Sequence, residues 1–154
     1  MPSITPAYLY TFAALIAISS LLTFSFTAYT STLKTASETN KLKNVLEYVA
    51  AESTELLTLT KSTNATAEVF LQTPTTIGEK QYWLKFYNDS LKVWIEGGLG
   101  GTPVENGGIR VYLPSDVHVE GYYIGGYGAL HLKCVLNGST PWLQLSSVSE
   151  EGTQ

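Results

Sequence analysis

The chain begins with a long hydrophobic stretch, and no Asp, Glu, Lys or Arg occurs before Lys34. The core of this stretch runs from Ala7 to Ala28. As an α-helix rising ~1.5 Å per residue it would be about 33 Å long, enough to cross a hydrocarbon layer of about 30 Å. Ser and Thr side chains dilute the stretch, and they can bond within their own helix or to a neighbouring one. Thr5 and Pro6 are typical of a helix start, as cap and first helical residue.

Beyond Leu33 the hydrophobic pattern continues in a different form. Apolar and small residues follow the i, i+3, i+4, i+7 spacing of an amphipathic helix at Leu42, Val45, Leu46, Val49, Ser53, Leu56 and Leu57. No Gly or Pro occurs from residue 7 to residue 73. The pattern therefore predicts one helix that ends near Lys61 to Asn64. The alternative is two helices joined by a hinge at residues 30–32, where three poor helix formers are consecutive.

From Ala65 onward the hydrophobic period falls to two, which indicates β-strands. Short strands are predicted around residues 69–72, 81–87, 91–96, 109–113, 130–136 and 142–145, with a Gly-rich loop at 97–108 and a segment rich in Gly and Tyr at 121–128. These elements predict an α+β protein, in which a long hydrophobic N-terminal helix precedes a small antiparallel β-sandwich or barrel. Residues 1–64 would form the helical domain. Residues 65–154 would form the β domain, with a frayed tail from about residue 147.

Charge and candidate chemistry argue against an enzyme or a nucleic-acid-binding protein. The net charge is −4, and the nine basic residues are scattered rather than clustered. His118 and His131 fall at outward positions of alternating strands, and Cys134 falls on an apolar face. The Gly-rich run at 97–101 is followed by no lysine and no helix, unlike a phosphate-binding loop. We expect no catalytic residues, metal or cofactor.

Aromatic residues gather in the predicted β domain, and more of them occur there than a small core requires. Exposed aromatic clusters are typical of contact surfaces. The residues that we expect at contacts between subunits are Trp83, Trp94, Tyr122, Tyr123 and Tyr127.

Three Asn-x-Ser/Thr patterns, at Asn64, Asn88 and Asn137, are candidate glycosylation sites in predicted loops or turns. They favour an extracytoplasmic β domain. Lys34, Lys41 and Lys43 follow the apolar stretch and favour the opposite orientation by the positive-inside rule. We place the β domain outside, because long domains translocate largely regardless of charge.

The chain resembles the type IV pilin superfamily, and more narrowly the archaeal pilins, archaellins and archaellum accessory proteins. The resemblance rests on the architecture, on the stretch Val45-Leu-Glu-Tyr-Val-Ala50, on Thr73-Pro-Thr-Thr-Ile-Gly78 with the following Tyr82, and on the hairpin around Asn88. It implies that apolar helices bundle in a filament core and that β domains form a glycosylated outer sheath. The bundling residues would be Leu9, Phe12, Leu15, Ile16, Leu21, Leu22, Phe24 and Phe26. The chain departs from the family in having no Lys or Arg before the apolar stretch and no glutamate near its start.

Two functions of different classes follow from these observations. The first is a structural subunit of a cell-surface filament, which is a homo-oligomer whose helix resides in the membrane before assembly. The second is a single-pass anchored binding module, or an archaellum accessory protein, whose β domain contacts a cell-envelope partner. A small subunit of an integral membrane complex is a third possibility.

Overall fold

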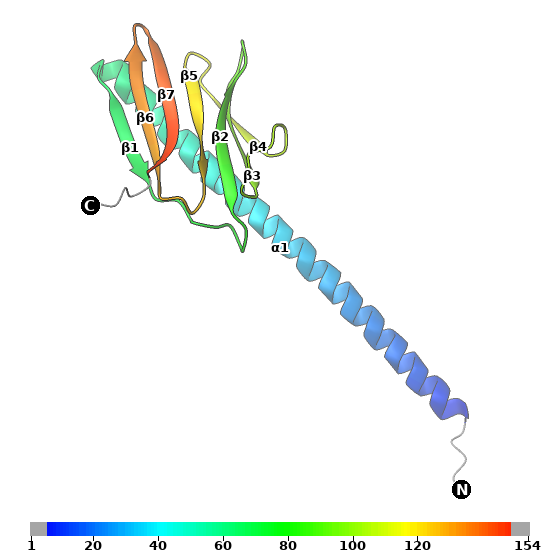
Figure 1. The fold of residues 1–154 in the computed structure, drawn as a ribbon. Helices are drawn as coiled ribbons and strands as arrows, with labels where there is room; N and C mark the ends of the chain where they lie inside the picture. Colours follow the sequence, from blue (N-terminus) through cyan, green and yellow to red (C-terminus); the bar gives the residue numbers. More distant parts are fainter. Residues whose placement is uncertain (1–5, 149–154) are drawn as a thin grey trace, which may run out of the picture. The chain divides into compact units, whose positions relative to one another are not determined.

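The computed structural model describes residues 6–148, which form one helix followed by seven strands (Figure 1). The helix is α1 (Pro6–Thr63). The strands are β1 (Ala67–Leu71), β2 (Tyr82–Asn88), β3 (Val93–Leu99), β4 (Ile109–Leu113), β5 (His118–Ile124), β6 (Ala129–Asn137) and β7 (Thr140–Val148). This order confirms the α+β class and the helix end predicted near Lys61 to Asn64. Thr5, the predicted helix cap, lies outside the described residues.

The chain divides into two compact units, one up to Ser37 and one from Glu38 onward. The boundary falls inside α1, so the sheet-containing unit includes the last part of the helix. Within the first unit α1 is helical through residues 30–32, where the sequence left a hinge open. The hydroxyls of Thr30 and Thr32 donate to the carbonyls of Phe26 and Ala28 at 2.8 and 3.1 Å, so these side chains are accommodated by the helix.

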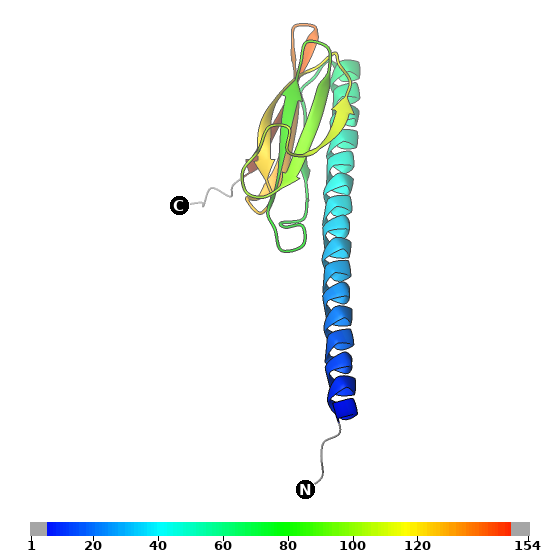
Figure 2. The same cartoon turned by 90° about the vertical axis from the view of Figure 1, so that its right-hand side faces the viewer.

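The seven strands form one sheet in the order β1-β6-β7-β5-β2-β3-β4. All neighbours are antiparallel except β5 and β7, which are parallel over His118–Gly121 and Trp142–Leu145. The sheet is one layer of the domain, and the C-terminal part of α1 is the second layer, running along one face of the sheet (Figure 2). Because this helix buries the apolar face of the sheet, the domain needs no second sheet.

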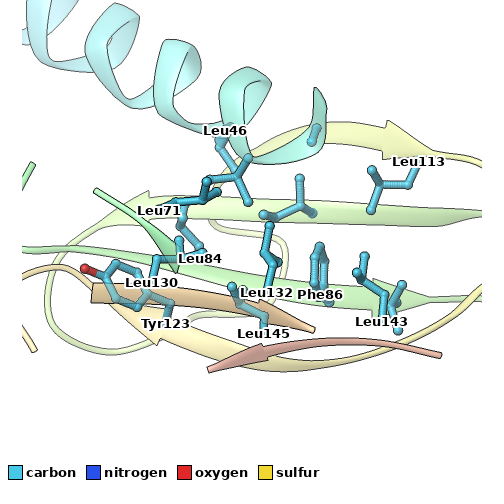
Figure 3. Close-up of a cluster of buried hydrophobic side chains, with 14 of the residues drawn as sticks. Leu46, Leu71, Leu84, Phe86, Leu113, Tyr123, Leu130, Leu132, Leu143 and Leu145 are labelled. Carbon is cyan, nitrogen blue, oxygen red and sulfur yellow. The ribbon is translucent and has the colours of Figure 1, made fainter. Parts of the chain in front are cut away.

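The core lies between α1 and the inner face of the sheet. Leu42, Leu46 and Val49 are buried against inward residues of the strands. In Figure 3, Leu46 of the helix points toward Leu71, Leu84 and the leucines of β6 and β7. Each such side chain contributes about 1.5–3 kcal/mol when fully removed from water.

Several strand boundaries differ from those predicted. β3 continues through Gly97 and Gly98, which the sequence assigned to a loop. Any larger residue would force its neighbours to shift, because a Cβ on Gly97 would lie 2.8 Å from a methyl group of Leu84, and one on Gly98 would lie 2.8 Å from the ring of Trp83. β5 was missed because its residues overlap the segment rich in Gly and Tyr. β7 runs to Val148, beyond the point where fraying was predicted, and residues 149–154 lie outside the described residues.

The Pro-x-x-Ile-Gly segment ends in a tight turn that packs against α1. Ile77 and Lys80 exchange two backbone hydrogen bonds of 2.9 and 3.3 Å, and Ile77 is buried in the core. Lys80 Nζ lies 3.0 Å from a carboxylate oxygen of Glu38, whose side chain is buried. Gly78 has φ +66°, and a Cβ there would lie 2.6 Å from Glu38 Oε1. The turn thus closes over the first residue of α1 that belongs to the sheet-containing unit.

Candidate functional site

The helical segment of residues 6–37 has every side chain exposed within its own unit. Among the described residues, α1 contains the one stretch that is long and apolar enough to cross a membrane. All the residues predicted to bundle are exposed, namely Leu9, Phe12, Leu15, Ile16, Leu21, Leu22, Phe24 and Phe26. A surface of this kind is stable in water only when lipid or other protein covers it.

Many Ser and Thr hydroxyl groups of this segment donate to carbonyl groups of the helix itself. Ser20 donates to the carbonyl of Ile16 at 2.8 Å, and Thr23 and Thr27 donate to the carbonyls four residues earlier at 2.9 Å. No hydroxyl in this set needs water as a partner, so each can enter an apolar environment. Small hydroxyl residues also allow two helices to approach closely. Together with Leu15, Ile16, Ser19 and Phe24 they line a shallow groove along the helix.

Two of the five aromatic residues predicted at subunit contacts are instead buried within their own chain. Trp83 and Tyr123 are each 1% exposed, so the prediction that they face a neighbouring subunit is wrong. The ring of Trp83 lies against Gly98 across the β2–β3 pair, on the outer face of the sheet. Tyr123 belongs to the core on the inner face. Burial of a ring beneath its own chain removes the area that a partner could contact.

Tyr82 and Tyr123 instead form hydrogen bonds with the segment that precedes β2, and Tyr123 also bonds to the residue that precedes β6. The Tyr82 hydroxyl donates to the carbonyl of Pro74 at 2.7 Å, and the Tyr123 hydroxyl donates to the carbonyl of Gly128 at 2.9 Å. Thr73 donates to the Tyr123 hydroxyl at 3.2 Å. Burial raises the pKa of Tyr82 to about 12, because the charged phenolate would lose its hydration.

Trp94 lies in a row of three rings on the outer face, which we call the aromatic ladder: Tyr87, Trp94 and Tyr112. The three are directly opposite one another on β2, β3 and β4, with ring centroids 5.9 and 6.4 Å apart. The ladder is partly covered, because the Arg110 guanidinium lies 5.2 Å from the centre of the Trp94 ring. Such a row can present flat aromatic area to a partner.

A buried carboxylate, Glu96, supports this row from the same face. Glu96 is 1% exposed and accepts from Arg110 Nε at 2.9 Å, from the backbone N–H of Gly108 at 3.1 Å and from Trp94 Nε1 at 3.4 Å. A buried charge with this many partners fixes the side chains around it.

Tyr122 and Tyr127 are exposed, and with Gly121, Ile124 and Leu145 they line a groove near the ends of β5 and β7. Their contact with a neighbouring subunit stays a prediction. The sequence prediction missed two further exposed rings, Phe70 on β1 and Tyr112 on β4. Both occupy polar positions in the two-residue alternation of their strands, which is the signal that could have identified them.

The three candidate glycosylation sites are all exposed and lie at one end of the sheet-containing unit. Asn64 follows the last residue of α1, and Asn88 and Asn137 are the last residues of β2 and β6. Figure 1 shows the ends of α1, β2 and β6 at the same end of the sheet. Asn88 Nδ2 lies 3.4 Å from the His118 ring, and His118 pairs with Trp142 just after the turn that follows Asn137.

The remaining titratable candidates pack against neighbouring side chains of the described sheet. His131 stacks on Phe70 with ring centroids 4.5 Å apart, and His118 packs edge-on against Trp142 at 5.0 Å. Cys134 is buried, and desolvation raises the pKa of its thiol. Within residues 6–148, no three His, Cys, Asp or Glu side chains are placed to share a metal ion.

Comparison with known protein families, curated proteins and solved structures finds no match to this chain.

Proposed function

We propose that this chain is the structural subunit of an archaeal type IV pilus-like filament on the cell surface. The helical segment of residues 6–37 bundles with its copies in the filament core, and the sheet-containing unit forms the outer sheath. Before assembly the same segment resides in the membrane, with the β domain outside. The three candidate glycosylation sites favour that orientation.

The observation that carries this proposal is the continuity of α1. An anchor needs about 20 apolar residues, whereas α1 has 58 residues and continues into the core of the sheet-containing unit. The same helix thus begins in the membrane-resident segment and ends in the domain that would coat the filament. Ser and Thr hydroxyls that donate to carbonyls of their own helix, together with exposed Leu, Ile and Phe side chains, allow the first segment to leave lipid and pack against its copies.

A second candidate function is an anchored binding module, and the aromatic ladder is the observation that favours it. A row of rings on an outer sheet face, with Lys85 and Lys92 over the rings of Tyr87 and Tyr112, could contact a cell-envelope polymer. The two functions predict different assembly states of the same full-length chain.

Shearing of cells, followed by sedimentation and mild detergent extraction, separates these functions. For a filament subunit we expect the full-length chain in a high-speed pellet that resists detergent and contains fibres labelled by an antibody to the β domain. A chain that stays with the membrane and leaves it as a small detergent-soluble species would contradict the filament proposal and support the anchored module. Co-purification with other membrane proteins in fixed ratio would indicate a subunit of an integral complex.

A further inference from the structure

The sheet ends in two strands, β1 and β4, that each pair on one side only. Figure 1 shows them at opposite edges of the sheet. Among residues 6–148, no backbone hydrogen bond reaches the free side of either strand, since β1 pairs with β6 and β4 pairs with β3. A free strand edge presents a row of N–H and C=O groups that can pair with another chain.

The two edge strands share one pattern. Both are five residues long, with apolar residues directed inward at positions one, three and five and larger or charged residues directed outward at positions two and four. Most inward residues of the interior strands are buried, whereas Ala67, Val69, Ile109 and Val111 of the edge strands are only partly buried. Each edge therefore leaves apolar core surface uncovered.

The outward residues of the two strands are complementary. Glu68 is the charged residue of β1, and Arg110 is the charged residue of β4. One carboxylate oxygen of Glu68 lies 3.2 Å from His131 Nε2 of its own chain, but the Glu68 side chain is 52% exposed, so the carboxylate can also meet a second partner. Glu96 and Asn106 occupy only part of the five N–H donors that the Arg110 guanidinium carries. The neighbouring rings, Phe70 and Tyr112, are 57% and 60% exposed. Neither strand contains the Pro or Lys that commonly protects an edge from pairing.

We propose that β4 of one copy pairs with β1 of a second copy, an interface that rests on the proposed filament function and specifies how the sheath is built. β1 and β4 run in opposite directions within the sheet, as follows from the one parallel and five antiparallel pairings between them. Copies that share one orientation therefore pair in antiparallel fashion.

A register with Val69 opposite Val111 satisfies both faces of the joined sheets. On the inner face the two valines and their neighbours cover each other's exposed apolar surface. On the outer face Phe70 lies opposite Arg110, which favours a cation–π contact, and Glu68 lies diagonal to Arg110, within reach of an ion pair.

This interface is heterologous, because the edge used by one copy differs from the edge used by the next. A heterologous contact that does not close into a ring continues into a helical array. Edge pairing would thus join the sheets of successive subunits side by side around the core, without using the end that carries Asn64, Asn88 and Asn137.

Paired cysteines in the full-length chain test the interface. In the register given above, residues 68 and 112 are opposite each other, so the double variant Glu68→Cys/Tyr112→Cys should form covalent dimers and larger multimers on mild oxidation of filaments. The double variant Phe70→Cys/Tyr112→Cys tests a register that is shifted by two residues. Each single variant should remain monomeric on a non-reducing gel, because Cys134 has no exposed surface.

Microscopy of the same samples keeps the two proposals apart. Fibres of the wild type and of both double variants without any cross-link between chains would overturn edge pairing and leave the filament function intact. Absence of wild-type fibres would contradict the filament function itself, and the edge interface with it.

Lysine variants test the β1–β4 interface independently if a double cysteine variant assembles poorly. Tyr112→Lys or Phe70→Lys places a natural edge protector on a free strand, and we expect loss of fibres with the folded monomer retained. Val104→Lys is the matched control, because Val104 is 58% exposed but lies in the loop between β3 and β4, outside both edge strands. An equal loss of fibres with Val104→Lys would show that the added charge, and not the blocked edge, prevents assembly, and would overturn the edge interface.

Discussion

Gly78 shows at the scale of one residue how the Pro-x-x-Ile-Gly segment is constrained. Its backbone has φ +66°, a conformation that L side chains rarely adopt, and its missing Cβ leaves room for Glu38. Glu38 in turn is 3% exposed and depends on Lys80 as its ion-pair partner. The glycine, the buried carboxylate and the lysine therefore form one unit of packing.

Replacement of Gly78 by Ala should destabilise the β domain for two separable reasons. The positive φ alone costs about 1–2 kcal/mol, and the added Cβ would displace the Glu38 carboxylate. Gly138→Ala is the matched control, because Gly138 has φ +68° but a Cβ added to it would meet no atom within 4 Å. Urea unfolding followed by Trp fluorescence should show a larger loss for Gly78→Ala. Equal losses would mean that Glu38 moves aside freely.

The Tyr82 phenol should make the stability of the domain depend on alkaline pH. The pKa of Tyr82 is raised from 10.0 to about 12 by burial. The unfolded chain therefore loses this proton first as the pH rises. The stabilisation is complete below pH 10, where both states hold the proton, and is lost between pH 10 and about 12, by about 1 kcal/mol at pH 11.

Unfolding midpoints measured across this pH range test the prediction in the wild type and in Tyr82→Phe. The variant should be less stable near neutral pH, because it loses the hydrogen bond to Pro74, but its stability should fall less above pH 10. Tyr112→Phe, which removes an exposed phenol, should keep the wild-type decline. A decline of the same size in Tyr82→Phe would assign the pH dependence to another group.

At the scale of elements, α1 could be predicted from the sequence because its determinants are local. The spacing of Leu42, Leu46 and Val49 defines one helix face, and the absence of Gly and Pro favours continuity. The order of the strands depends on pairings between distant segments. The parallel contact of β5 with β7 could not be inferred from alternation within either strand.

The candidate contact residues show the same limit. Alternation gives the face of Trp83 on its strand, but its burial depends on Gly98 of the neighbouring strand, which provides the space for the ring. Tyr123 is interior because α1 covers the inner face of the sheet. The exposure of an aromatic side chain therefore depends on how the strands and the helix pack together, and this packing cannot be predicted from the residues of one strand.

A single charge in the apolar segment of α1 should prevent assembly. Ile16→Asp or Leu22→Asp would place an unpaired carboxylate in a helix bundle or a bilayer, where desolvation is costly. Both side chains are exposed within their own unit, so the loss cannot come from disruption of the sheet-containing core. Electron microscopy of cell surfaces should show no fibres for either variant.

Thr58→Asp provides a control on the same helix, since Thr58 is an exposed position of the sheet-containing unit. We expect normal fibres from it. Membrane fractionation of the Ile16 and Leu22 variants would separate failed insertion from failed bundling. Normal fibres from either Asp variant would refute a role for these residues in the filament core.

At the scale of the whole molecule, the candidate glycosylation sites share one end of the sheet-containing unit, and β1 and β4 form its lateral edges. Glycans at Asn64, Asn88 and Asn137 would cover that end and restrict it to contact with solvent. The edges and the apolar helical segment would remain available to other copies. This division of surfaces is what a sheath subunit requires.

Removal of each acceptor pattern should lower the mass of the chain purified from an archaeal host by one glycan. Asn88→Gln and Asn137→Gln test two sites directly. Asn64 has φ +53° at the end of α1, so Thr66→Ala is the better variant there, because it abolishes the pattern and leaves the helix end intact. Asn44→Gln is the control, because Asn44 is exposed on α1 and, being followed by Val45 and Leu46, lies in no acceptor pattern. Intact-mass spectrometry should show one mass step for each acceptor variant and none for the control.

Unchanged masses in all three acceptor variants would remove the glycan argument for an extracytoplasmic β domain. The orientation would then have to be established from accessibility to protease in intact cells.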